Sequence, residues 1–261
     1  MEQLVESVKR AVRIIRELTG ASPRLGVTEL AERVGISKSA MHGLLRTLES
    51  DGLVVQERES GKYRLGPALV TFGNAYLDTH ELRTRALTWS NLLATRADEA
   101  VWVGVLVQDE VLVIHHVCRP GSVVQPLETG ATLPWSTTAL GKAIAAFSSQ
   151  EQRKRLLDRP PAVLTGHSVT ELTELSKQLD QVREVGYALD SQEATLGDAG
   201  IAAPIFDRTG AVVGAIGVVG PVERLLEEGC RQGLSIATRE TARSLSRELG
   251  AHRFGTRITP C

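Results

Sequence analysis

The sequence has few of the features that mark secreted, membrane-bound or metal-binding proteins. Its three cysteines, Cys118, Cys230 and Cys261, are odd in number and widely separated, so the pattern indicates no disulfide framework. It has no apolar run of the roughly 18 residues that a membrane-spanning helix needs, and no signal peptide is recognisable in its charged N-terminal segment. We therefore expect a soluble cytoplasmic protein that needs neither a membrane nor a cofactor.

A strong excess of charge is also missing. The 261 residues carry a net charge of −1. Residues 1–66 contain eleven Lys/Arg and nine Asp/Glu, a difference of +2, which leaves −3 for the remainder. This weak asymmetry does not exclude binding to nucleic acid, because a regulator with few phosphate contacts per subunit needs no strongly basic domain. The length is sufficient for two domains.

Signatures of catalysis are absent as well. No G-x-S-x-G elbow is present, although Ser136 and His115 remain a conceivable nucleophile and base. His115 and His116 are adjacent on an expected strand, so their side chains point to opposite faces and cannot share one metal ion. We expect one to be buried and the other exposed. The sequence predicts no catalytic residue and no metal ligand.

Residues 28–52 instead have the pattern of a helix-turn-helix. Thr28 is an expected cap of the first helix, Gly35 supplies the sharp turn, and Ser37 caps the second helix. The second helix has an apolar face at helical spacing, formed by Met41, Leu44, Leu45 and Leu48. An ordinary pair of helices in a small α domain is the alternative.

The opposite face of the second helix suits the major groove of DNA. A polar hairpin follows, with short β-prone runs at 53–56 and 63–65 that predict a wing whose cations contact phosphates. The predicted DNA-binding residues are Thr28, Ser37, Lys38, Ser39, His42, Gly43, Arg46, Arg58, Lys62 and Arg64. Two alternatives stay open: Gly43 either lets the helix backbone approach a base pair or reflects drift, and Arg46 either contacts DNA or pairs with Glu49 or Ser50.

The remaining pattern predicts an α+β chain with two domains. A helix with an apolar stripe precedes the helix-turn-helix, which completes a winged domain over 1–66. A linker helix is expected over 67–86 with a break near 78–80, then an antiparallel-sheet domain over 87–250 and a loose tail over 251–261. Expected strands are 100–108, 111–118 (around a turn at Asp109-Glu110), 123–127, 187–190, 201–206 and 212–219; expected helices are 137–147, 149–157, 170–185 and a long one over 223–249.

Two separated stretches carry a family resemblance: GATLPWSTTALGKA at 130–143 and GIAAPIFDRTGAVVGAIGVVGP at 200–221. With the winged helix-turn-helix before them, they resemble the IclR family of bacterial transcription regulators over about residues 4–250. The resemblance implies a GAF-like effector domain, a homodimer or homotetramer on double-stranded operator DNA, and usually repression relieved by a small metabolite. The stretches at 42–52, 73–87 and 111–121 most resemble members that regulate glycerol operons.

The effector site is expected where the helix after Pro134 begins. Amides and hydroxyls at a helix N-terminus, with an ammonium one turn later, form a natural anion site; alternatively Ser136 or Thr137 merely caps the helix and Lys142 points to water. Asp190 matches the acidic pocket residue of the family, or else caps a turn. The predicted effector-binding residues are Thr137, Thr138, Ala139, Leu140, Lys142, Asp190, Gly200, Gly217 and Val219.

Three of these positions depart from the family pattern. Gly200 stands where a cysteine is common, and Gly217 and Val219 stand where sensors of small carboxylates have serines. The loss of one thiol and two hydroxyl groups from the pocket disfavours a glyoxylate- or pyruvate-sized acid as the effector. It favours a polyol or its phosphate, such as glycerol or glycerol 3-phosphate.

The sequence thus predicts a repressor of a catabolic operon, with the N-terminal helix and residues 67–87 as the subunit contact. An activator, or a regulator of another catabolic pathway, is the main alternative. An enzyme, or a sensor whose DNA-binding domain has decayed, fits the sequence less well.

Overall fold

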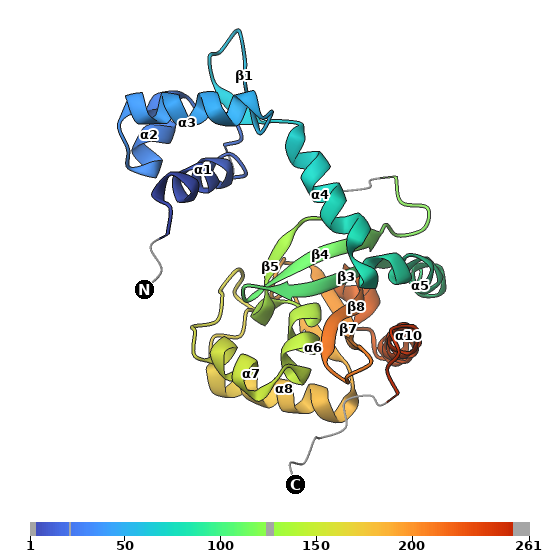
Figure 1. The fold of residues 1–261 in the computed structure, drawn as a ribbon. Coiled ribbons are helices and arrows are strands. Elements are labelled where there is room, and N and C mark those ends of the chain that lie inside the picture. Colours follow the sequence, from blue (N-terminus) through green and yellow to red (C-terminus); the bar gives the residue numbers. More distant parts are fainter. Residues whose placement is uncertain (1–3, 21, 124–127, 253–261) are drawn as a thin grey trace. The chain divides into compact units, whose positions relative to one another are not determined.

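The computed structural model describes residues 4–20, 22–123 and 128–252 (Figure 1). The chain divides into two compact units, Met1–Thr79 and His80–Cys261. No helix among the described residues is both long and apolar enough to cross a membrane.

The first unit is a three-helix domain with a two-stranded wing and a fourth helix. Its core is formed by residues such as Ile14, Leu18, Leu30, Met41 and Leu45, which are all fully buried. The strands pair antiparallel, with Val54 opposite Leu65. The elements are α1 (Glu6–Glu17), α2 (Val27–Val34), α3 (Lys38–Ser50), β1 (Val54–Gln56), β2 (Tyr63–Leu65) and α4 (Ala68–Thr79).

Local capping explains the turn between α2 and α3. Gly35 ends α2 with φ of 75°, a left-handed conformation that glycine adopts without steric cost. The Ser37 hydroxyl accepts a hydrogen bond from the Ala40 amide at 3.2 Å, which confirms the predicted cap of α3. The predicted cap at Thr28 is wrong, because the N-cap of α2 is Gly26, two residues earlier, and Gly26 donates its amide to the Glu29 carboxylate at 2.8 Å.

The second unit is built on a six-stranded antiparallel sheet with the order β5-β4-β3-β8-β7-β6. The predicted hairpin is confirmed as β3 and β4, although Gln108 and Asp109, with φ of 50° and 71°, form its turn. β5 was not predicted, and of the strand expected at 123–127, residues 124–127 lie outside the described residues. The strands are β3 (Ala100–Val107), β4 (Glu110–Val117), β5 (Thr132–Pro134), β6 (Ala188–Ser191), β7 (Asp198–Phe206) and β8 (Val212–Pro221).

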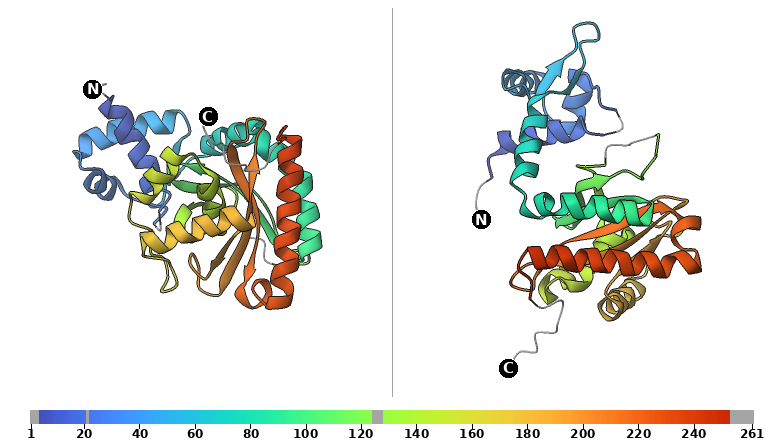
Figure 2. Two further views of the ribbon diagram at one scale, coloured as in Figure 1. Left: turned by 90° about the horizontal axis from the view of Figure 1, so that it is seen from below. Right: turned by 90° about the vertical axis from the view of Figure 1, so that its right-hand side faces the viewer.

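Helices cover both faces of this sheet (Figure 2). α5 (Glu81–Ala97) and α10 (Glu228–Glu248) pack together on one face, and α6 (Ala139–Phe147) lies on the other with α8 (Leu172–Val185) against it. α7 (Gln150–Leu157) contacts α6, and a short 3-10 helix, η1 (Trp135–Thr137), precedes α6 in the chain.

The single helix expected over 223–249 is wrong. A short helix, α9 (Val222–Leu225), comes first, and an extended residue, Glu227, separates it from α10. Leu225 is fully buried, and Arg224 holds Glu99 by two hydrogen bonds of 2.5 and 2.8 Å. These contacts with the sheet fix α9 in place, so the chain changes direction before α10 begins.

The two adjacent histidines are both half-buried, so the expectation of one buried and one exposed side chain is wrong. His116 reaches the Thr129 hydroxyl at 2.9 Å through Nδ1. Burial, together with Arg83 and His116, lowers the pKa of His115 to about 4. Within the described ranges no group of three or more His, Cys, Asp or Glu side chains is placed to hold a metal ion.

Candidate functional site

The first candidate site is the exposed face of α3. Ser39, His42, Gly43 and Arg46 are all exposed, while Met41, Leu45 and Leu48 on the opposite face are buried. The helical spacing therefore separates a core face from a polar face, as the sequence pattern predicts. Lys38 lies exposed in the first turn of the same helix, and Thr28 is exposed on α2.

Arg46 has no hydrogen-bond or ion-pair partner among the described residues. Its two possible surface partners are engaged elsewhere. Glu49 accepts a hydrogen bond from the Gln56 amide at 3.1 Å, and Ser50 donates to the Thr47 carbonyl at 2.7 Å. The guanidinium of Arg46 is thus available to a partner outside the chain.

Gly43 has open space where a side chain would be. A Cβ atom added there would meet no atom within 4 Å apart from its chain neighbours and the nearby backbone of its own helix. Packing within the chain therefore does not require glycine, although glycine in a helix interior costs about 1 kcal/mol relative to alanine. Two explanations for glycine at this position therefore stay open: a partner approaches the helix backbone closely, or the residue reflects sequence drift at an exposed position.

The wing carries two cations without an acidic partner in the part of the chain that the structure describes, Arg58 and Lys62, both exposed. Arg64 differs, because its Nε lies 3.7 Å from Glu57, which also binds Arg24 at 3.0 Å. Among the three predicted wing cations, Arg64 is therefore the one already partly neutralised.

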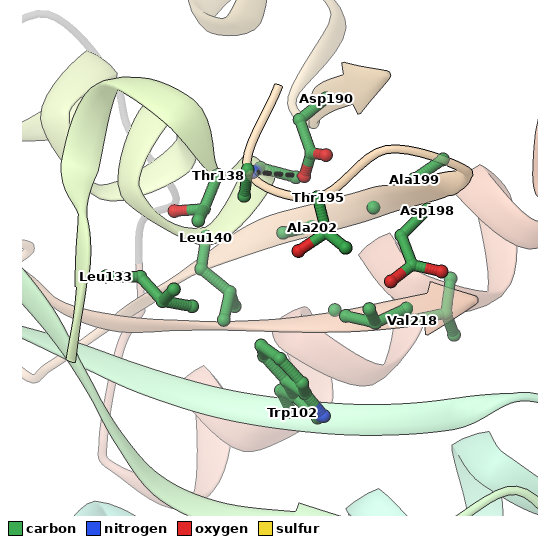
Figure 3. A pocket seen from close by; sticks show the side chains of 15 residues that line it. Trp102, Leu133, Thr138, Leu140, Asp190, Thr195, Asp198, Ala199, Ala202 and Val218 are labelled. Carbon is green, nitrogen blue, oxygen red and sulfur yellow. Dashed lines mark hydrogen bonds between the residues drawn. The ribbon is translucent and has the colours of Figure 1, made fainter. Parts of the chain in front are cut away.

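The second candidate site is a small cavity of about 70 Å³ between the sheet and the start of α6 (Figure 3). Seven of the predicted effector-binding residues line it, from three strands and the helix: Thr138, Ala139, Leu140, Asp190, Gly200, Gly217 and Val219.

Asp190 occupies the N-terminus of α6 with its own carboxylate. Its Oδ2 accepts a hydrogen bond from the Ala139 amide at 2.8 Å, and the Thr138 hydroxyl caps the Gly141 amide at 3.1 Å. Burial raises the pKa of Asp190 to about 6, against the opposing effects of the Ala139 amide and Lys142. The helix terminus is thus already satisfied by the chain itself, which differs from the open anion site expected from the sequence.

Lys142 and Thr137 do not line this cavity. The Lys142 ammonium is 1% exposed and lies 2.6 and 2.7 Å from the two oxygens of Glu193, itself buried. It neither points to water nor faces the cavity, because a buried ammonium needs a charged partner and Glu193 supplies one. Thr137 is fully buried and donates its hydroxyl to the Pro134 carbonyl at 3.2 Å.

The cavity also includes residues that the sequence pattern did not reveal. Figure 3 shows Thr195 between Asp190 and Asp198, with Trp102 on the opposite wall. Alternation along a strand predicts that Trp102 and Gly104 lie on the same face of the sheet. The neighbouring sequence does not indicate that this face adjoins a ligand site. The other unpredicted lining residues are Leu133, Ala194, Ala199, Ala202 and Val218.

Gly200 and Gly217, which line this cavity, are closely packed against their neighbours. A Cβ at Gly200 would lie 2.5 Å from Asp190 Oδ2 and 3.3 Å from the Ala139 Cβ. At Gly217 it would lie 2.7 Å from the Ile201 carbonyl oxygen. Any larger residue at either position must shift its neighbours, so both glycines have a packing reason.

Comparison with known proteins agrees with this arrangement. The model of the IclR helix-turn-helix domain matches residues 7–58, and that of the bacterial transcriptional regulator IclR C-terminal domain matches residues 74–247. The glycerol operon regulatory protein of Streptomyces griseus is 45% identical over 97% of this chain and 100% of its own length. Its namesake in Streptomyces coelicolor is 44% identical over the same shares.

A solved structure supports the fold. The crystal structure of an IclR transcriptional regulator from Alicyclobacillus acidocaldarius matches 95% of this chain and 100% of its own, with a TM-score of 0.82 and 26% identity. Both family models and these relatives describe DNA-binding regulators rather than enzymes. The chain therefore belongs to the IclR family of bacterial transcriptional regulators.

Proposed function

We propose that this regulator represses a catabolic operon for glycerol and releases its operator when glycerol occupies the cavity beside α6. The two relatives named as glycerol operon regulatory proteins support the pathway. The observation that carries the choice of ligand is the charge of the cavity wall.

The cavity wall favours a neutral ligand over an anion. Asp190 and Asp198 both line it, and no Lys, Arg or His stands among its described lining residues. Lys142, the nearest candidate cation, is neutralised by Glu193. A phosphate group would face two carboxylates, whereas a hydroxyl can donate a hydrogen bond to either one. This argument separates glycerol from glycerol 3-phosphate, which the sequence alone leaves open.

The size of the cavity agrees with the same choice. A volume of about 70 Å³ is several times the roughly 10–15 Å³ that one water molecule needs, so the cavity suits a small ligand. Glycerol has six non-hydrogen atoms and glycerol 3-phosphate has ten. The Trp102 side chain gives an apolar surface for the carbon chain, and Thr195 and Thr138 add hydroxyl groups.

Release of the operator follows because a ligand hydroxyl competes with the Ala139 amide for the Asp190 carboxylate. A ligand hydroxyl that donates to this carboxylate weakens its bond to the Ala139 amide, and so changes the cap of α6. The ligand binds more tightly to an arrangement of the subunits that does not fit the operator than to the one that does. This difference in affinity, typically about 1–3 kcal/mol, lowers the affinity for the operator.

A second copy of the chain is the proposed partner of the first unit. α1 exposes apolar side chains such as Val8 and Val12, and α4 exposes Val70 and Phe72 at more than 60%. Exposed apolar residues on two helices beside a helix-turn-helix suit the contact that pairs two recognition helices on a near-palindromic site. Sedimentation of the full chain should show a dimer or tetramer, and a monomer at micromolar concentration would contradict this contact.

Calorimetric titration of the full chain tests the ligand. Glycerol should release heat and saturate, glycerol 3-phosphate should give no binding heat, and 1,3-propanediol, which lacks one hydroxyl, should bind more weakly. Glycerol should also release labelled operator DNA. If glycerol gives no heat while another metabolite releases the operator, the proposed effector is wrong.

A further inference from the structure

A second hollow lies at the other end of α6, away from the cavity just described. It is bounded by the C-terminal ends of α6 and α8, by β7 and by one face of α10, and its volume is about 250 Å³. Arg183, Arg239 and Arg243 line it together with a single acidic side chain, Glu184. Its apolar wall includes Phe147 and Phe206, whose rings meet edge to face at 5.3 Å.

Two of these arginines, Arg239 and Arg243, carry positive charge that no described residue balances. Arg239 and Arg243 stand four residues apart on α10, so the two cations share one helix face, an arrangement that is unfavourable unless an anion lies nearby. Neither forms an ion pair with a described residue. Arg239 and Arg243 therefore give the α10 wall of the hollow an excess of positive charge.

The arginines are also held in position. Arg239 donates Nη1 to the Val185 carbonyl at 2.8 Å, and Arg183 donates Nε to the Ala146 carbonyl. The Nε of Arg239 is buried without a hydrogen-bond partner among the described residues, although a buried donor costs free energy until it is satisfied. Arg239 therefore keeps its other Nη donors for a ligand, and Arg243 has no hydrogen-bond partner in the described part of the chain.

We propose that this hollow is a second ligand site and that it binds a small phosphate monoester with an apolar body. The guanidinium groups recognise the phosphate oxygens through paired, charge-assisted hydrogen bonds. Phe147 and Phe206 contact the organic part, because they form an apolar wall beside the charged groups. The site is separate from the glycerol cavity, whose wall is acidic, so the two select ligands of opposite character.

Titration of the full chain with phenyl phosphate at physiological ionic strength tests the proposal. We expect saturable binding, at least about tenfold weaker binding of inorganic phosphate, which lacks the ring, and no binding of phenol, which lacks the charge. Arg243→Gln should weaken phenyl phosphate binding at least about tenfold. This variant should fold normally, because Arg243 is exposed.

Arg231→Gln on the same helix is the matched control, because this exposed arginine does not line the hollow. It should bind phenyl phosphate as the unchanged protein does. The absence of binding by the unchanged protein, or binding that survives in Arg243→Gln, would overturn the site. Equal affinity for inorganic phosphate would overturn the role of the apolar wall, and tighter binding of benzoate would overturn the choice of a phosphate.

Discussion

Replacing Asp190 by asparagine should stabilise the protein and weaken its response to glycerol. Asp190→Asn keeps an oxygen that accepts the Ala139 amide but removes a buried charge. Because the folded protein raises the pKa of this carboxyl from 3.8 to about 6, it binds the proton more tightly than the unfolded chain does. A difference of about 2 in pKa corresponds to about 3 kcal/mol of destabilisation from the ionised group.

The direction of the pH dependence follows from the same difference. Well below pH 3.8 the carboxyl is protonated in both states and contributes no penalty. As the pH rises from 4 to 6 the unfolded chain loses its proton first, so the native protein becomes progressively less stable. Above about pH 6.5 the penalty is complete. The stability gained by Asp190→Asn should therefore grow from near zero at about pH 3 to about 3 kcal/mol at pH 7.5.

Urea unfolding of both proteins at several pH values measures this gain, because other carboxyl groups cancel in the difference. Asp158→Asn, at an exposed position after α7, should show little change with pH. In the same preparation the Asp190→Asn variant should bind glycerol at least about tenfold more weakly, since a charged acceptor is lost. Loss of stability at pH 7.5, or a gain that is equal at pH 5 and pH 7.5, would refute the reasoning.

Two further substitutions test other parts of the structure. Lys142→Met should destabilise the protein by about 3–5 kcal/mol in urea unfolding, because Glu193 is left buried and unpaired. The double variant Lys142→Met with Glu193→Leu should recover most of this loss of stability, and equal losses in the two variants would show that the ion pair is not the cause. Gly43→Ala should raise the free energy of unfolding by about 1 kcal/mol yet weaken operator binding in a fluorescence anisotropy titration, since the added methyl group has space in the free protein but not against a base pair; unchanged operator affinity would favour drift at this position.

The DNA-facing unit was largely predictable because its signals are local. A cap such as Ser37 and a left-handed turn at Gly35 act within a few residues, so the sequence alone indicates where α3 begins. Even here the N-cap of α2 was misplaced by two residues. The bond between Gly26 and Glu29 caps that helix, and a threonine two residues after Gly26 resembles a cap equally well in the sequence.

The cavity beside α6 was predictable in part: the helix start after Pro134 indicated Thr138, and the family resemblance indicated Asp190, Gly200, Gly217 and Val219. Lys142 was assigned to the ligand because its partner, Glu193, lies 51 positions away and no periodic pattern connects them. Asp198 and Trp102 come to the cavity from separate strands of the sheet. Pairing of distant strands depends on tertiary packing, so the acidic character of this wall, on which the choice of ligand depends, was not visible in the sequence.

Operator binding by Arg46→Ala tests the central claim most directly. With DNA from the promoter upstream of the protein's own gene, anisotropy should show a loss of about 1–3 kcal/mol in binding free energy, while glycerol binding to the free variant stays unchanged. Arg16→Ala, at another exposed arginine of the same unit, should retain operator affinity. Unchanged operator affinity in Arg46→Ala, or an equal loss in Arg16→Ala, would contradict the claim that the exposed face of α3 reads the DNA.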